Sequence, residues 1–245
     1  MNKEYCNSHC FLTRNLSMKM KPKVGSKISL ILFDMDGVLV DTISSWRFIH
    51  NYFSTDNQES VKAYINGEID DYEFIRKDVN KWRVNNISIT NELLGTILKD
   101  ISYMKGAEAC LKRLYKKDIK TAIVSAGIKL LANRIAKELH IDYVYANELL
   151  VDMNNRLTGE GIVQVPLKHK DRAVYDISTS LGIPTKEILA VGNSCFDIPL
   201  LLSVGIGVAF NPEDDCIAKY ADEIIYQKDL SLLLPIIEKY HNLDE

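Results

Sequence analysis

Short apolar runs of strand length recur along most of this 245-residue chain, and helical periodicity or turn residues separate them. The first run, residues 28–33, is almost continuously apolar, as expected of a strand buried on both faces of a parallel sheet. Strands that alternate with helices join through right-handed crossovers. The pattern therefore predicts an α/β fold with a doubly wound parallel sheet, whose later strands we expect at residues 121–125, 143–145, 188–191, 206–210 and 223–226.

Two segments depart from this alternation. Residues 42–103 show only helical patterns and predict a bundle of four amphipathic helices, with capping residues at Thr42, at Asp70 or Asp71, and at Thr90. Residues 149–161 carry Asn154 and Asn155 between two short runs, which is typical of a hairpin after the third strand. We therefore expect a helical cap of residues 42–103 inserted into a core of residues 28–41 and 104–245.

The formal net charge of −3 is too weak to indicate nucleic acid or a membrane surface as a partner. Residues 1–27, by contrast, carry six basic side chains and one acidic side chain, and we interpret them as a basic, disordered tail or as a late start at Met18 or Met20. No apolar stretch reaches the roughly 18–20 residues of a membrane span, and five cysteines are too few for a disulfide scaffold at this length. We therefore expect a cytoplasmic protein with free thiols, whose oligomeric state the sequence does not indicate.

Two carboxylates, Asp34 and Asp36, come directly after the first buried strand. In open α/β sheets ligands bind at the carboxyl ends of the strands, so both side chains should lie where a site is expected. Burying two acids is costly unless a cation compensates, and hard oxygen ligands favour Mg²⁺. Taken alone, the same residues followed by Gly37 are also consistent with an ordinary turn.

Other strand ends carry groups that complement these carboxylates: Ser125 before Ala126 and Gly127, Lys170 before a helix, and Asn193 and Asp197 in one loop. In this order and spacing, the chain from residue 28 to about residue 230 resembles the haloacid dehalogenase superfamily of phosphohydrolases. The helical insertion after the first motif is similar to that of the phosphoserine-phosphatase-like branch. The resemblance implies a Rossmann-like core with an inserted small helical-bundle cap.

The resemblance also implies a role for each residue. Asp34 would attack phosphorus and form an aspartyl-phosphate, and Asp36 would be the general acid and then the base. Because a departing halide needs no proton, Asp36 favours phosphoryl transfer over dehalogenation. The phosphoryl oxygens would be held by Ser125, Ala126 and Gly127 together with Lys170, and Mg²⁺ by Asp34, Asp36, Asn193 and Asp197.

Two lysines compete for the role of neutralising the phosphoryl group. Lys170 opens an amphipathic helix, with apolar side chains three and four positions later, as the family's lysine does. Lys168 has charged residues at those offsets, and His169 between them is expected to be a loop residue. We therefore choose Lys170.

Asn193 departs from the family pattern, which has an aspartate that binds Mg²⁺ at this position, with Asp197 supporting either the metal or the lysine. An asparagine carbonyl can coordinate a hard cation but adds no charge, so we expect an active enzyme with weakened metal binding. Phe196 likewise replaces a common polar neighbour. These changes leave open a catalytically weakened member that binds or senses a metabolite.

Two cap positions bear on the substrate. In phosphoserine phosphatases an acidic residue and a cap arginine bind the amino-acid part of the substrate. Here those positions fall on Ile43 and Asp78, and the nearby Arg76 could replace the arginine. We therefore predict hydrolysis of another small phosphomonoester, under a cap that closes at residues 41–42 and 104–106. A phosphotransferase or mutase stays an alternative, because it differs only in the group that accepts the phosphoryl group from Asp34.

Overall fold

The computed structural model describes residues 21–25 and 27–241, so the expected tail of residues 1–27 falls mostly outside the described part. Seven strands form one sheet in the order β6-β5-β4-β1-β7-β8-β9. All neighbours pair in parallel except β5 and β6, which form the predicted antiparallel hairpin. The predicted doubly wound α/β sheet is confirmed. The strands are β1 (Leu30–Phe33), β4 (Lys120–Ile128), β5 (Tyr143–Val151), β6 (Leu157–Ile162), β7 (Ile188–Gly192), β8 (Ile206–Phe210) and β9 (Glu223–Ile225).

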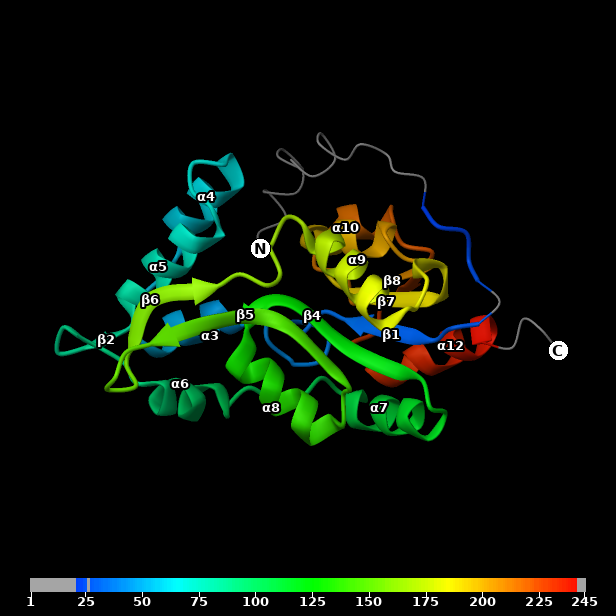
Figure 1. Ribbon diagram of the computed structural model, residues 1–245, viewed down its shortest axis with the longest axis horizontal. Coiled ribbons are helices and arrows are strands. Elements are labelled where there is room, and N and C mark those ends of the chain that lie inside the picture. Colours follow the sequence, from blue (N-terminus) through cyan, green and yellow to red (C-terminus); the bar gives the residue numbers. More distant parts are fainter. Residues whose placement is uncertain (1–20, 26, 242–245) are drawn as a thin grey trace.

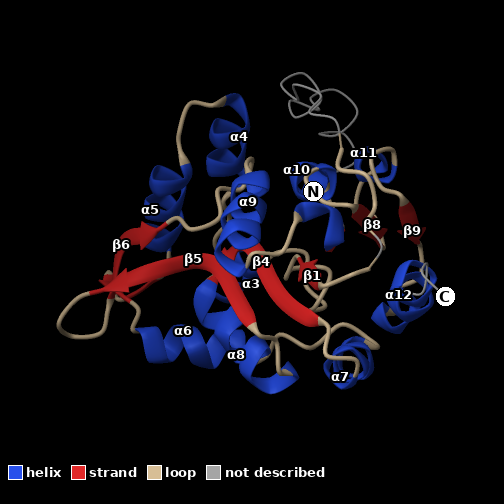
Figure 2. Cartoon of the chain, turned by 45° about the vertical axis from the view of Figure 1, so that its right-hand side comes forward, coloured by secondary structure: helices blue, strands red, loops and turns tan. Residues whose placement is uncertain are grey.

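Helices cover both faces of the sheet (Figure 1; Figure 2). Side chains alternate across β1, so Ile31 and Phe33 join the hydrophobic cluster on one face while Leu30 and Leu32 join the cluster on the other. Each of these side chains is fully buried, and such burial contributes about 1.5–3 kcal/mol per side chain. The first face packs on α7 (Ala107–Lys116), α8 (Lys129–Leu139) and α12 (Leu233–His241), and the second on α9 (Lys170–Leu181), α10 (Ile198–Leu202) and α11 (Asp215–Ala218).

The strand order reverses beside β1. The chain leaves β1 for β4 and β5 on one side and later returns for β7, β8 and β9 on the other. Ligand crevices of open α/β sheets lie at such switch points, at the carboxyl ends of the strands. Asp34 is the first residue after β1, and its N–H donates to the Val191 carbonyl of β7 at 2.9 Å. This bond fixes Asp34 at the switch point.

The inserted segment contains the four predicted helices, namely α3 (Ser45–Tyr52), α4 (Gln58–Asn66), α5 (Asp71–Lys81) and α6 (Asn91–Leu98). Two predicted caps are confirmed, because Asp70 accepts a hydrogen bond from the Glu73 N–H and Thr90 accepts one from the Leu93 N–H. The prediction for the first cap is wrong by two residues. Ser44 rather than Thr42 caps α3.

The all-helical prediction also missed a hairpin, β2 (Arg83–Val84) with β3 (Ile87–Ser88). Its turn residues Asn85 and Asn86 have φ values of 50° and 62°. Positive φ at both central positions is the requirement of the tight turns that match strand twist, and asparagine adopts it more readily than most residues. The Asn-Asn pair was therefore a usable signal.

The β5–β6 hairpin reaches from the sheet to the inserted helices and lies against α5 (Figure 1). Three hydrogen bonds tie it to the segment before α6: the Leu157 N–H donates to the Ile89 carbonyl, the Arg156 guanidinium to the Ser88 carbonyl, and the Ser88 hydroxyl to the Leu157 carbonyl, at 2.7–2.9 Å. The cap is thus held at a third place besides the linkers at residues 41–42 and 104–106. The predicted opening of the cap would therefore require this hairpin to move with the cap or to release it.

The described residues also bear on the expectations for membrane spans and cysteines. No helix in the described residues is long and apolar enough to cross a bilayer. Cys110 and Cys195 are buried and are not disulfide-bonded, as expected. Cys216 is disulfide-bonded, so the expectation of free thiols is wrong for this residue.

Candidate active site

A buried ion cluster lies at the carboxyl end of β1. The Lys170 ammonium donates to Asp34 Oδ1 at 2.8 Å and to Asp197 Oδ1 at 2.6 Å. Lys170 is the first residue of α9, and its own exposure is 2%. The side chains come from three separate stretches of the chain, which only the sheet topology brings together.

Burial decides the electrostatics of this cluster. It raises the pKa of Asp34 to about 7, with a further increase from the Asp197 charge and an opposing decrease from Lys170. Burial alone would lower the pKa of Lys170, but the charges of Asp197 and Asp34 raise it above its ordinary value. The lysine therefore stays charged, whereas Asp34 keeps its proton to a higher pH than an ordinary aspartate does.

Asp36 contacts the first cap helix. Its Oδ2 accepts hydrogen bonds from both the backbone N–H and the hydroxyl of Ser45, each at 2.8 Å. Burial raises the pKa of Asp36 to about 6, although the two bonds from Ser45 lower it. Asp36 Oδ1 is out of contact with solvent and has no hydrogen-bond partner.

The end of β4, where the pairing with β5 shifts register between Ser125 and Ile128, supplies the predicted phosphate-binding group. Ser125 is buried, and its hydroxyl accepts a hydrogen bond from the Gly127 N–H at 3.1 Å. A Cβ at Gly127 would lie 2.5 Å from Met35 Cε and 3.0 Å from Ser45 Oγ, so a larger residue would require these side chains to move. The Ala126 carbonyl accepts a bond from the Trp46 indole N–H of α3 at 3.2 Å.

Asn147, which the sequence analysis missed, also holds this segment. Its amide group donates to the Ala126 carbonyl at 3.2 Å and to the Val165 carbonyl at 3.1 Å, and its Oδ1 accepts from the Val165 N–H at 2.9 Å. It is 3% exposed within β5. An asparagine inside an apolar strand run was the available signal, because a buried amide needs partners.

Lys168 and Lys170 point to different places. The Lys168 ammonium lies 4.4 Å from the centroid of the Tyr64 ring and donates to the Tyr64 and Ile65 carbonyls at the end of α4. The neighbouring Leu167 N–H donates to Asp71 Oδ1 at 3.0 Å. Lys168 therefore contacts the cap, whereas Lys170 contacts the carboxylates. His169 between them is exposed.

The loop after β7 is organised around Asp197. Asp197 Oδ2 accepts hydrogen bonds from the Asn193 and Ser194 N–H groups at 2.9 and 3.1 Å, while Oδ1 accepts from Lys170. Asp197 thus contacts the lysine, one of the two roles that the sequence left open. Asn193 is 6% exposed and lies against Gly37, where an added Cβ would come within 2.1 Å of Asn193 Nδ2.

The cap positions expected to read a substrate have other surroundings. Ile43 is 57% exposed. Asp78 is fully buried, with its Oδ2 2.7 Å from Asn57 Nδ2 and 3.2 Å from His50 Nε2. Arg76 forms ion pairs with Glu73 and Glu160 and is turned toward β6.

A family model described as haloacid dehalogenase-like hydrolase matches residues 31–202, which include all the carboxylates, the lysine and the glycine-containing end of β4. The chain belongs to the haloacid dehalogenase-like hydrolase family. This hydrolase is 35% identical over 155 residues to a phosphoserine phosphatase of Lactococcus lactis, a match that covers 62% of this chain and 68% of the relative. It is 28% identical over 218 residues to a phosphoserine phosphatase of Methanocaldococcus jannaschii, covering 86% and 99% of the two chains.

Solved structures agree with this assignment. A substrate-bound phosphoserine phosphatase complex superposes with a TM-score of 0.73 at 27% identity and covers 86% of this hydrolase and 99% of the other chain. A phospho-aspartyl intermediate analogue of phosphoserine phosphatase gives a TM-score of 0.72 at 27% identity, with the same coverage. The hydrolase is therefore similar to phosphoserine phosphatases over the core and the inserted helices.

The donor set of this hydrolase fits a divalent cation. Asp34, Asp36 and Asp197 oppose the single ammonium of Lys170, so the cluster carries an uncompensated charge of about −2 when all groups are ionised. The Asp34 carboxylate, the main-chain carbonyl of Asp36 and the Asn193 amide carbonyl are oxygen donors of the kind that Mg²⁺ prefers. Among the described residues, no three His, Cys, Asp or Glu side chains converge on one metal position, so water or backbone oxygens would complete the coordination.

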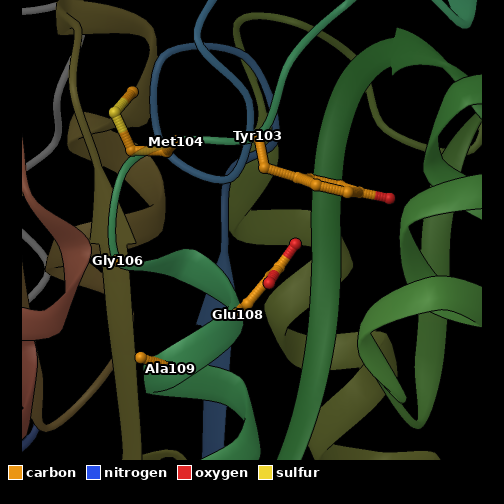
Figure 3. A pocket seen from close by; sticks show the side chains of 5 residues that line it. All are labelled: Tyr103, Met104, Gly106, Glu108 and Ala109. Carbon is orange, nitrogen blue, oxygen red and sulfur yellow. The ribbon is translucent and has the colours of Figure 1, made fainter.

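Two cavities lie beside the linkers. One of about 130 Å³ borders the site, because Gly37 and Asn193 line it together with Ile43 and Lys228. The other, of about 330 Å³, lies where the second linker enters α7 (Figure 3). Its lining residues, Tyr103, Met104, Gly106, Glu108 and Ala109, bring together none of the groups of the site.

Proposed function

We propose that this chain is a Mg²⁺-dependent phosphatase that hydrolyses the phosphate monoester of a small metabolite through an aspartyl-phosphate on Asp34. The observation that carries the proposal is the buried contact of Lys170 with both Asp34 and Asp197 at the carboxyl end of β1. Such a lysine neutralises charge beside a carboxylate nucleophile, and phosphoryl transfer depends on this kind of positioning and charge stabilisation.

The first step forms a bond from an Asp34 carboxylate oxygen to phosphorus and breaks the bond from phosphorus to the ester oxygen. Asp36 gives its proton to the departing alkoxide, which leaves as an alcohol. In the second step Asp36 accepts a proton from water as the water oxygen attacks phosphorus, which releases phosphate and restores Asp34. Ser125, the N–H groups of residues 126–127 and Lys170 hold the phosphoryl oxygens in both steps.

The metal would be held by the Asp34 carboxylate, the main-chain carbonyl of Asp36 and the Asn193 amide, with Asp197 acting through Lys170. When bound, Mg²⁺ supplies positive charge beside the nucleophile and the phosphoryl oxygens. Because Asn193 is neutral, its carbonyl contributes less to affinity than a carboxylate would. We expect activity at higher Mg²⁺ concentrations than an aspartate at this position would require.

The substrate is a small phosphorylated metabolite other than phosphoserine. Several relatives are named phosphoserine phosphatases. In this chain, however, the exposed Ile43 offers no charge for an ammonium group, and the buried Asp78 offers none for a carboxylate. Arg76 is already paired with Glu73 and Glu160. The helical cap favours a small metabolite over a nucleic acid as the substrate.

The test is phosphate release from a panel of small phosphate esters, with and without Mg²⁺, by the wild type and by Asp34→Asn. Asp118→Asn is the matched control, because its side chain is 95% exposed. We expect Mg²⁺-dependent release that Asp34→Asn abolishes and Asp118→Asn retains. Activity retained by Asp34→Asn would refute the mechanism. Turnover of phosphoserine far above all other esters would refute only the substrate assignment.

A further inference from the structure

Ser45 holds the acid–base carboxylate from the cap side. It is the first residue of α3, and both its donors, the backbone N–H and the hydroxyl, point to Asp36 Oδ2. Ser45 is completely buried. The first N–H groups of a helix have no partner within the helix, so the Ser45 N–H is free to bind this carboxylate.

The same helix end contacts the end of β4. Ser45 Oγ lies 3.0 Å from the place of a Cβ at residue 127, and the next residue, Trp46, donates to the Ala126 carbonyl. Ser45 therefore lies between the carboxylate of Asp36 and the segment expected to bind the phosphoryl group. With Oδ2 occupied, the buried Oδ1 is the oxygen of Asp36 left to exchange a proton with a substrate.

We propose that Ser45 is a positioning residue for the proposed phosphatase reaction: its two hydrogen bonds to Oδ2 aim Oδ1 of Asp36 at the leaving-group oxygen. This inference rests on the proposed function. It makes proton transfer depend on the seating of α3, because the acid is held correctly only when the cap helix is in place. Two hydrogen bonds to Oδ2 restrain rotation of the Asp36 carboxylate more than a single bond would.

A purely structural role for Ser45 predicts a different outcome. Ser44, not Ser45, caps α3 through a bond from the Arg47 N–H to its hydroxyl, at 3.3 Å. Loss of that cap would weaken the helix end without removing a bond to Asp36. Ser44→Ala is therefore the matched control for a variant of Ser45.

Two substitutions remove the bonds in steps. Ser45→Ala removes the hydroxyl and keeps the N–H. Ser45→Pro removes both donors, and proline is well tolerated at the first position of a helix. Ser44 has φ −162° and ψ 129°, the extended conformation that a residue before proline adopts.

The measurement is kcat/KM for a series of substituted phenyl phosphates, from p-nitrophenyl phosphate to phenyl phosphate. A good leaving group needs little protonation, whereas a poor one depends on the general acid, which contributes about 10²–10⁴-fold. We expect the rate ratio of p-nitrophenyl phosphate to phenyl phosphate to rise about threefold to tenfold in Ser45→Ala, and by at least about tenfold in Ser45→Pro. Ser44→Ala should keep the wild-type ratio whatever its absolute rate.

Equal losses on all esters, or an unchanged ratio in Ser45→Ala, would overturn the positioning role while leaving the phosphatase function intact. If Ser45→Pro does not fold, Ser45→Ala alone decides the question. A wild-type protein that hydrolyses no ester would instead refute the proposed function, and the role of Ser45 with it. The two failures are therefore distinguishable.

Discussion

Asp34 should destabilise the metal-free protein at neutral and alkaline pH. Its pKa is about 7 in the folded state against an ordinary value of 3.8, chiefly because of burial. The folded state therefore binds the proton more tightly than the unfolded state between these values, so stability falls as pH rises from about 4 to about 7. Above pH 7 the full penalty is present and stays constant.

The difference between the ordinary and the folded-state pKa of Asp34 corresponds to a free-energy penalty of about 4 kcal/mol for the ionised carboxylate. Relaxation of the site and entry of water reduce such penalties in real proteins, so we expect about 2 kcal/mol. Asp34→Asn removes the charge and keeps an oxygen that can accept from Lys170. It should raise the free energy of unfolding by about 2 kcal/mol at pH 8 without metal, and by close to zero at pH 4.

The assay is urea unfolding of wild type and Asp34→Asn at pH 4, 6 and 8, in EDTA and in excess Mg²⁺. Mg²⁺ should stabilise the wild type more than the variant and so reduce or reverse the difference at pH 8. Asp118→Asn controls for loss of an exposed charge and should change stability by less than about 0.5 kcal/mol. Two results in EDTA would contradict the penalty assigned to Asp34. One is a variant less stable than wild type at pH 8, and the other is a variant more stable than wild type by the same amount at pH 4 as at pH 8.

Three further predictions concern Asn193, the two lysines and the core of the cap. Asn193→Asp should lower the Mg²⁺ concentration for half-maximal activity by about tenfold or more, and an unchanged concentration would contradict the role given to Asn193. Lys170→Met should reduce kcat for phosphate release at least about 10²-fold, whereas Lys168→Met should change it less than about fivefold. Equal losses in the two variants would contradict the choice of Lys170 over Lys168. Trp82→Ala should lower the free energy of unfolding by about 3–5 kcal/mol in thermal or urea unfolding, because Trp82 is fully buried beside Trp46. A loss below about 1 kcal/mol would contradict its place in the core of the cap.

The sheet was predictable because its strands are buried on both faces and therefore read as continuous apolar runs. Their ends were harder. Strand β5 continues to Val151, well beyond its apolar start, because it pairs there with β6. The β2–β3 hairpin has strands of two residues, too short for any periodicity, and only its Asn-Asn turn marked it.

The site was predictable where single motifs carry the chemistry. Asp34, Lys170 and Asp197 meet as expected, and the Gly127 N–H donates to the Ser125 hydroxyl at the end of β4. Ser45, Trp46 and Asn147 were not found, because their roles arise only when the cap and the β5 strand pack on that segment. A serine at a helix start and an asparagine in a strand look like local features in the sequence, and tertiary contacts alone show what they bind.

The central claim is that Asp34 carries the phosphoryl group. It is tested most directly by mixing the wild type with Mg²⁺ and an ester that it turns over, quenching in acid within the first turnover, and mapping the digested protein by mass spectrometry. We expect a peptide containing Asp34 that is heavier by one phosphoryl group, and no such peptide from Asp34→Asn. Phosphate release with no phosphorylated peptide at any time in the first turnover, or a phosphoryl group on another residue, would contradict it.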